Sequence, residues 1–174
     1  MTRTILGMAC AIVGMAVAQM TVAGQGGSDL TKLTVPASQL PAACRLIPGP
    51  RGFLKTNPAV ITDSEQLGFV HSLLFGGSKS VATDDMRARG AQVAVGYAAA
   101  YEEKDGAHEI GVYALRLKDP AAAKKARATA AAGRVLHVTK GSVAIFSWVD
   151  VLPGRKDSGC FDAIRRHIES VELK

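Results

Sequence analysis

The pattern of hydrophobic and polar residues predicts four β-strands in the second half of the chain. Apolar residues dominate residues 91–101 and 108–118, and again residues 134–139 and 142–150. Asp105-Gly106 lies between the first two stretches, and Lys140-Gly141 lies between the second two. Because Asp-Gly and similar glycine-containing pairs favour tight hairpin turns, the sequence predicts two β-hairpins.

Three further stretches have the spacing of helices: residues 62–75, 120–132 and 160–173. Thr62 and Glu65 form a capping box at the start of the first. Asp119 and Pro120 suit the N-cap and the first helical position of the second. The polar stretch 78–91 is interpreted as a loop with at most one helical turn.

The order of these elements predicts an α+β fold. A helix is followed twice by a strand-strand-helix unit, which favours an antiparallel sheet of about four to five strands from two hairpins, packed with three helices on one face. Residues 43–47 supply a further short strand, and "PGPRG" at 48–52 a turn.

The two faces of the predicted sheet look alike. In residues 108–118 and 142–150 both sets of alternating side chains are apolar, whereas a sheet with one solvated face alternates apolar and polar residues. We therefore expect the second face to be covered by the helix at 62–75, by a second subunit or by a ligand.

The first residues have the three parts of a secretory signal peptide. Arg3 precedes an apolar run from Ile5 to Val17, and Ala16-Val17-Ala18 forms a cleavage site. We expect a signal peptide at 1–18, a flexible leader at 19–38 and a single domain at 39–174. The alternatives are cleavage after Ala23 and an uncleaved anchor, since residues 4–23 carry no charge. The style of the signal indicates a bacterial protein that is periplasmic or secreted.

Cleavage would remove Cys10 and leave two cysteines, Cys44 and Cys160. An even number of cysteines in an exported chain favours a disulfide, which here would link the start of the domain to the last helix. The alternative is a pair of buried free thiols.

Charge does little to identify a partner. The formal net charge of +6 falls by one without Arg3, and the basic residues are scattered with few aromatic residues between them, which argues against nucleic acid. Two possible partners remain: an anionic membrane or cell wall, bound by weak electrostatic attachment, and a second copy of the chain in a homodimer.

Motifs for catalysis, metals, phosphates and cofactors are absent from the sequence. His137 is the histidine best placed in a predicted strand, and four aromatic residues also lie on strands. The candidate ligand-binding residues are therefore Tyr97, Tyr101, Tyr113, His137 and Trp148.

These features favour a non-catalytic exported domain that binds a small ligand or a protein partner through its sheet. The alternative is a small exported hydrolase whose site is assembled from distant residues, with His137 beside a carboxylate and a hydroxyl.

Overall fold

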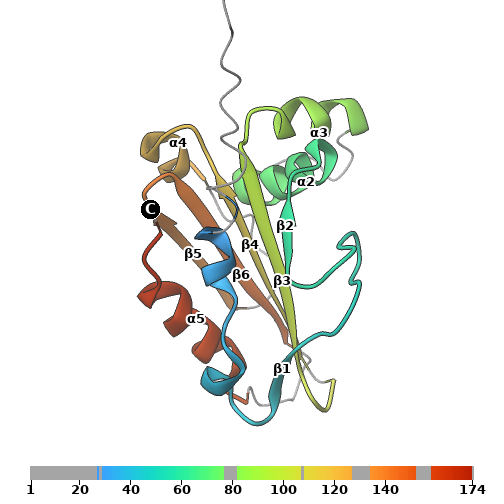
Figure 1. Cartoon of the computed structure of the whole chain (residues 1–174), viewed down its shortest axis with the longest axis vertical. Helices are drawn as coiled ribbons and strands as arrows, with labels where there is room; N and C mark the ends of the chain where they lie inside the picture. Colours follow the sequence, from blue (N-terminus) through green and yellow to red (C-terminus); the bar gives the residue numbers. More distant parts are fainter. Residues whose placement is uncertain are drawn as a thin grey trace, which may run out of the picture.

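The computed structural model describes residues 27, 29–76, 82–106, 108–126, 134–151 and 158–173. These residues form a six-stranded antiparallel sheet in which β3, β4, β6 and β5 lie side by side (Figure 1). Both β1 and β2 pair with the outer edge of β3. The strands are β1 (Cys44–Leu46), β2 (Ala59–Ile61), β3 (Val95–Glu103), β4 (His108–Arg116), β5 (Arg134–Lys140) and β6 (Val143–Val151).

Helices cover both faces of this sheet. The helices are α2 (Ser64–Phe75), α3 (Thr83–Gly90), α4 (Pro120–Lys124) and α5 (Cys160–Ser170), with 3₁₀ turns η1 (Thr31–Leu33) and η2 (Ala37–Gln39). The face that carries Tyr97 and Ile145, here called the first face, packs against α5 and the N-terminal 3₁₀ turns (Figure 1). The face that carries Ala98 and Phe146, the second face, packs against α2 and α4.

The predicted α+β class and the order of its long elements are confirmed. Both hairpins are present, and their turns contain Gly106 and Gly141 at positive φ. The short strand predicted at 43–47 is present as β1, whereas the three-residue β2 on the same edge of β3 was not predicted. The sheet therefore has six strands, slightly more than the four to five predicted. The prediction of helices on one face is wrong, since α5 lies opposite α2 and α4.

The stretch interpreted as a loop contains the eight-residue helix α3. Its side chains are mostly exposed, so it lacks the apolar stripe by which a helix is predicted. Close backbone contact with α2 holds it instead: a Cβ at Gly68 would lie 1.6 Å from the carbonyl oxygen of Met86. The helix predicted at 120–132 is described only to Lys124, and residues 127–133 lie outside the described part of the chain.

The N-terminal segment is part of the first-face core. Leu30 and Leu33 are fully buried, and Val35 is nearly so. The hydroxyls of two core tyrosines bind this segment: Tyr97 shares a 2.7 Å hydrogen bond with the Thr34 hydroxyl, and Tyr101 accepts one of 3.0 Å from the Val35 amide. Residues 29–38, predicted to belong to a flexible leader, are therefore packed; the signal peptide prediction at 1–18 lies outside the described residues.

A disulfide joins Cys44 of β1 to Cys160, the first residue of α5. The two Cα atoms are 5.6 Å apart, and the residues are separated by 116 positions in the sequence. The predicted link between the start of the domain and its last helix is confirmed. No helix in the described ranges is long and apolar enough to cross a membrane.

Candidate binding groove

The candidate site is built around residues 48–58, here called the edge loop. β1 and β2 both pair with β3, and the chain between them leaves the sheet. Asn57 fills the interruption: its side-chain amide donates to the carbonyls of Ile47 (2.7 Å) and Ala100 (2.8 Å), and its side-chain oxygen accepts from the Ala100 amide (2.9 Å). One asparagine side chain thus replaces a strand residue and frees the edge loop to extend over the second face.

The tip of the edge loop places two apolar side chains on that face. Arg51 and Leu54 exchange two backbone hydrogen bonds of 3.0 and 2.9 Å, which close a tight turn. Leu54 is buried in the second-face core, while Phe53 is only partly buried. The turn predicted at 48–52 is therefore part of a longer structure that the local sequence does not reveal.

Phe53 belongs to a row of half-buried aromatic side chains. Its ring centroid lies 4.9 Å from that of Phe69 on α2 and 5.9 Å from that of Tyr113 on β4. Tyr113 in turn stacks on Trp148 of β6 at 4.7 Å. The Trp148 indole lies over Gly111, where an added Cβ would come within 1.8 Å of the ring. The row crosses the second face from β6 to α2.

A hollow of about 290 Å³ lies over part of this row. Phe53, Tyr113 and Trp148 line it, together with an ion pair between Arg51 of the edge loop and Glu109 of β4. Burial, with a smaller contribution from the negative charge of Glu109, raises the pKa of Tyr113. Its phenol therefore stays protonated and can donate a hydrogen bond at neutral pH.

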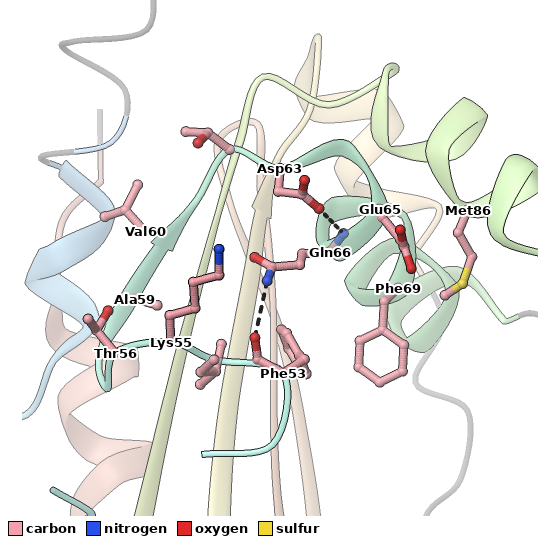
Figure 2. Close-up of a pocket in the computed structure, with 12 residues that line it drawn as sticks. Phe53, Lys55, Thr56, Ala59, Val60, Asp63, Glu65, Gln66, Phe69 and Met86 are labelled. Carbon is pink, nitrogen blue, oxygen red and sulfur yellow. Dashed lines mark hydrogen bonds between the residues drawn. The ribbon is translucent and has the colours of Figure 1, made fainter. Parts of the chain in front are cut away.

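A larger groove of about 670 Å³ lies on the other side of Phe53, between the edge loop, β2 and the start of α2 (Figure 2). Phe53, Leu54, Phe69 and Met86 give it an apolar lining. Its lining residues are Phe53, Leu54, Lys55, Thr56, Ala59, Val60, Thr62, Asp63, Glu65, Gln66, Phe69 and Met86. The combined size of the groove and the hollow is that of a small-molecule or short-peptide site.

The polar residues of the groove have structural roles as well. The Asp63 carboxylate accepts from the Gln66 amide at 2.9 Å and so caps α2, one residue later than the capping box predicted from Thr62 and Glu65. The Gln66 side chain donates to the Phe53 carbonyl at 3.1 Å, which ties the edge loop to α2 (Figure 2). Lys55 and Glu65 are exposed at the rim. The groove thus combines an apolar floor with charged groups of both signs.

The structure divides the five sequence-predicted site residues between the two faces. Tyr97 and Tyr101 are fully buried on the first face, where burial raises the pKa of both phenols. Tyr113, Trp148 and His137 lie on the second face. His137 is half-buried on β5 and pairs across the sheet with Phe146, and it is not among the residues that line the groove or the hollow.

The sequence did not single out a buried hydrogen-bonded pair, Glu103 and His108. The Glu103 carboxylate lies 2.9 Å from His108 Nδ1 and accepts a 2.8 Å hydrogen bond from the Ser158 amide, just before α5. Burial raises the pKa of Glu103, but hydrogen bonds from Ser158 and His108 outweigh it, so the pKa is lowered overall. Both residues are at most 3 % exposed, which argues for a structural role. Their positions flanking the predicted Asp105-Gly106 turn were the only signal of the pair.

No known protein family, curated protein or solved structure matches the chain. In the described ranges, no cluster of three or more His, Cys, Asp or Glu side chains could hold a metal ion. Functional reasoning therefore rests on the groove and on its aromatic row.

Proposed function

We propose that this protein is an exported, non-catalytic domain that binds a ligand or a protein partner at the groove on the second face of its sheet. The observation that carries the proposal is the groove of about 670 Å³, whose floor includes the partly buried Phe53 of the edge loop and Phe69 of α2. The smaller hollow, lined by Phe53, Tyr113 and Trp148, lies beside it. Monomeric proteins rarely leave such a set of apolar side chains open without a binding role.

Two features support the exported location. The Cys44–Cys160 disulfide is of a kind that persists in oxidising compartments. The first residues carry the pattern of a bacterial signal peptide with cleavage after Ala18. Both features are expected of a periplasmic or secreted protein.

The groove's chemistry favours binding over catalysis. Asp63 caps α2 and Gln66 holds the edge loop, so both side chains are engaged in the fold. The remaining charged groups at the rim, Lys55 and Glu65, are exposed, whereas catalytic acids and bases are typically enclosed with a partner that tunes their pKa. Recognition of an apolar ligand with polar substituents is the function that these residues suit.

Native mass spectrometry of the protein recovered from the exported fraction tests the proposal. We expect a chain that begins at Gln19, lacks the two hydrogens lost on disulfide formation and carries a bound mass. The double variant Phe53→Ala/Phe69→Ala should lose that mass, while Phe75→Ala should keep it, because Phe75 is on α2 but does not line the groove.

Four outcomes separate the alternatives. Bound mass that survives in the double variant contradicts the groove as the site. A homodimer that the double variant abolishes makes a second copy the partner. A chain whose mass includes residues 1–18 contradicts release by cleavage after Ala18, and protein released from membranes by salt alone indicates electrostatic attachment.

The hydrolase alternative stays a prediction. It requires His137 to work with a carboxylate and a hydroxyl, and the groove is lined by other residues. Hydrolysis of ester or peptide probes that disappears in His137→Ala, but not in Phe53→Ala/Phe69→Ala, would favour it.

A further inference from the structure

We propose that the occupant of the groove is an extended peptide, which binds as an additional strand on the free edge of β2. The inference deepens the function proposed above and rests on it. Strand addition requires an edge with unpaired backbone groups, and a neighbouring pocket for alternate side chains of the added strand. Both are present beside β2.

The direction of the β2 backbone groups follows from β3. Ala100 directs both its amide and its carbonyl at Asn57, toward the edge where β1 and β2 lie. In a strand, alternate residues direct these groups to the same side, so Ala98 and Gly96 also point toward β2. They pair with Ala59 and Ile61, which leaves the amide and carbonyl of Val60 pointing away from the sheet.

These outward groups have no partner within the described part of the chain. Among the described residues, β2 pairs only with β3, and no hydrogen bond reaches the amide or carbonyl of Val60. Val60 is also 43 % exposed and is the one large hydrophobic residue that is exposed in the described ranges. An incoming backbone supplies an acceptor and a donor at the spacing that these two groups need.

The stretch of β3 between β1 and β2 is closed to an added strand. Asn57 occupies the hydrogen-bonding groups of Ala100, between β1 and β2. At the opposite edge of the sheet, β5 ends at Lys140, and a lysine on an edge strand commonly protects it from unwanted pairing. β2 carries no such residue.

The free edge also adjoins the groove. Ala59, Val60 and Thr62 are part of the groove's lining, with Lys55 and Thr56 of the edge loop beside them. Side chains of a strand alternate between faces, so every second residue of an added strand faces the groove on the second face. The apolar floor formed by Phe53 and Phe69 suits an aliphatic or aromatic side chain.

The test uses the disulfide-bonded chain from Gln19 to Lys174 and a phage-displayed pool of random heptapeptides. Peptides selected on the protein are synthesised, and their affinity is measured by calorimetry and by the fluorescence of Trp148, the single tryptophan. Each is then made in two N-methylated forms, with methyl groups on one or the other alternating set of amides. Only one set can face β2, so one form should bind about tenfold or more weakly and the other nearly normally.

A protein variant gives the reciprocal test. Val60→Pro removes the outward amide without removing a hydrogen bond to β3, and proline is tolerated on edge strands. It should weaken peptide binding about tenfold or more, while Val60→Thr, which keeps the amide, should not. Circular dichroism and thermal unfolding check that both variants are folded.

The outcomes also separate this inference from the proposed function. Equal sensitivity of the two N-methylated forms, or failure to select any peptide above the Val60→Pro background, overturns strand addition. If the bound mass of the exported protein still depends on Phe53 and Phe69 in that case, the groove remains a binding site with another class of ligand. If neither peptide nor bound mass depends on the groove, both proposals fail.

Discussion

At the scale of single residues, two tyrosines on neighbouring strands have different environments. Tyr97 and Tyr113 are both aromatic residues on apolar strands, yet Tyr97 is buried beneath the N-terminal segment and Tyr113 borders a hollow. When both faces of a strand are apolar, alternation does not say which face is open. The hydrogen bond between Tyr97 and Thr34 joins residues 63 positions apart, and nothing local predicts it.

Glu103 gives a prediction at this scale. Its pKa is lower in the folded protein than the unfolded value of about 4.3, so its ionised form stabilises the fold. That stabilisation is complete above the unfolded pKa and is lost as the pH falls through the lower folded pKa. Glu103→Gln should therefore lower the free energy of unfolding at pH 7, and its deficit should shrink between about pH 5 and pH 3.

Urea unfolding of the parent protein and of Glu103→Gln from pH 7 to pH 3 measures how their difference in stability depends on pH. Glu102→Gln is the matched control, because Glu102 is the next residue along the strand and forms an ion pair with Arg45, whose side chain is 53 % exposed. The control should change little with pH, since surface ion pairs contribute about 1 kcal/mol or less. A deficit for Glu103→Gln that is constant down to pH 3 would contradict the role assigned to the ionised carboxylate.

At the scale of elements, length and periodicity decide what the sequence reveals. The four long strands and α2 and α5 span enough residues to show a period, and all were predicted. β2 has three residues and α3 has no apolar stripe, so pattern alone gives weak or misleading signals for them. β1 is equally short and was predicted as a strand at 43–47. The groove lies where β2 and α3 meet α2 and the edge loop, so its outline could not be predicted.

The contact between α2 and α3 predicts how Gly68→Ala changes stability. Helix propensity and steric overlap have opposite effects on the free energy of unfolding of this variant. Gly68 is inside α2, and helix propensity alone predicts that alanine there stabilises by about 1 kcal/mol. A Cβ at Gly68 would instead meet the backbone of Met86 at 1.6 Å, and backbone cannot rotate away. Gly68→Ala should therefore destabilise by about 2–3 kcal/mol, as overpacking does.

Chemical denaturation measures the change, and Ser72→Ala, one turn further along α2, is the control. Ser72 is partly buried and bonds only the carbonyl of Gly68, so its replacement should change stability by about 0.5 kcal/mol or less. Because Met86 lines the groove, Gly68→Ala should also weaken binding there. Stabilisation by Gly68→Ala would mean that the two helices are further apart than described.

At the scale of the whole molecule, the two faces of the sheet pack against different elements and have different roles. The first face holds the N-terminal segment and α5, and the disulfide joins the start of α5 to β1. The second face holds α2, the aromatic row and the groove. The disulfide could be predicted from the even number of cysteines that remains after the predicted cleavage. The groove could not, because its walls come from segments that meet only after folding.

Because the disulfide and the groove lie on different faces, we predict that removing the Cys44–Cys160 disulfide leaves the groove intact. A link across 116 residues restricts the unfolded chain strongly, by about 5 kcal/mol in the chain-entropy model, and loss of native disulfides commonly costs about 2–5 kcal/mol. The Cys44→Ala/Cys160→Ala variant should lose stability in this range, with faster amide exchange in α5 and η1. Exchange in α2, fluorescence of Trp148 and ligand binding at the groove should stay close to those of the parent protein. Cys44 and Cys160 belong to the first-face core, whereas α2 and Trp148 pack in the second-face core. If amide exchange rises equally in α2 and α5, the loss of the disulfide destabilises both faces of the sheet. The disulfide then also stabilises the groove.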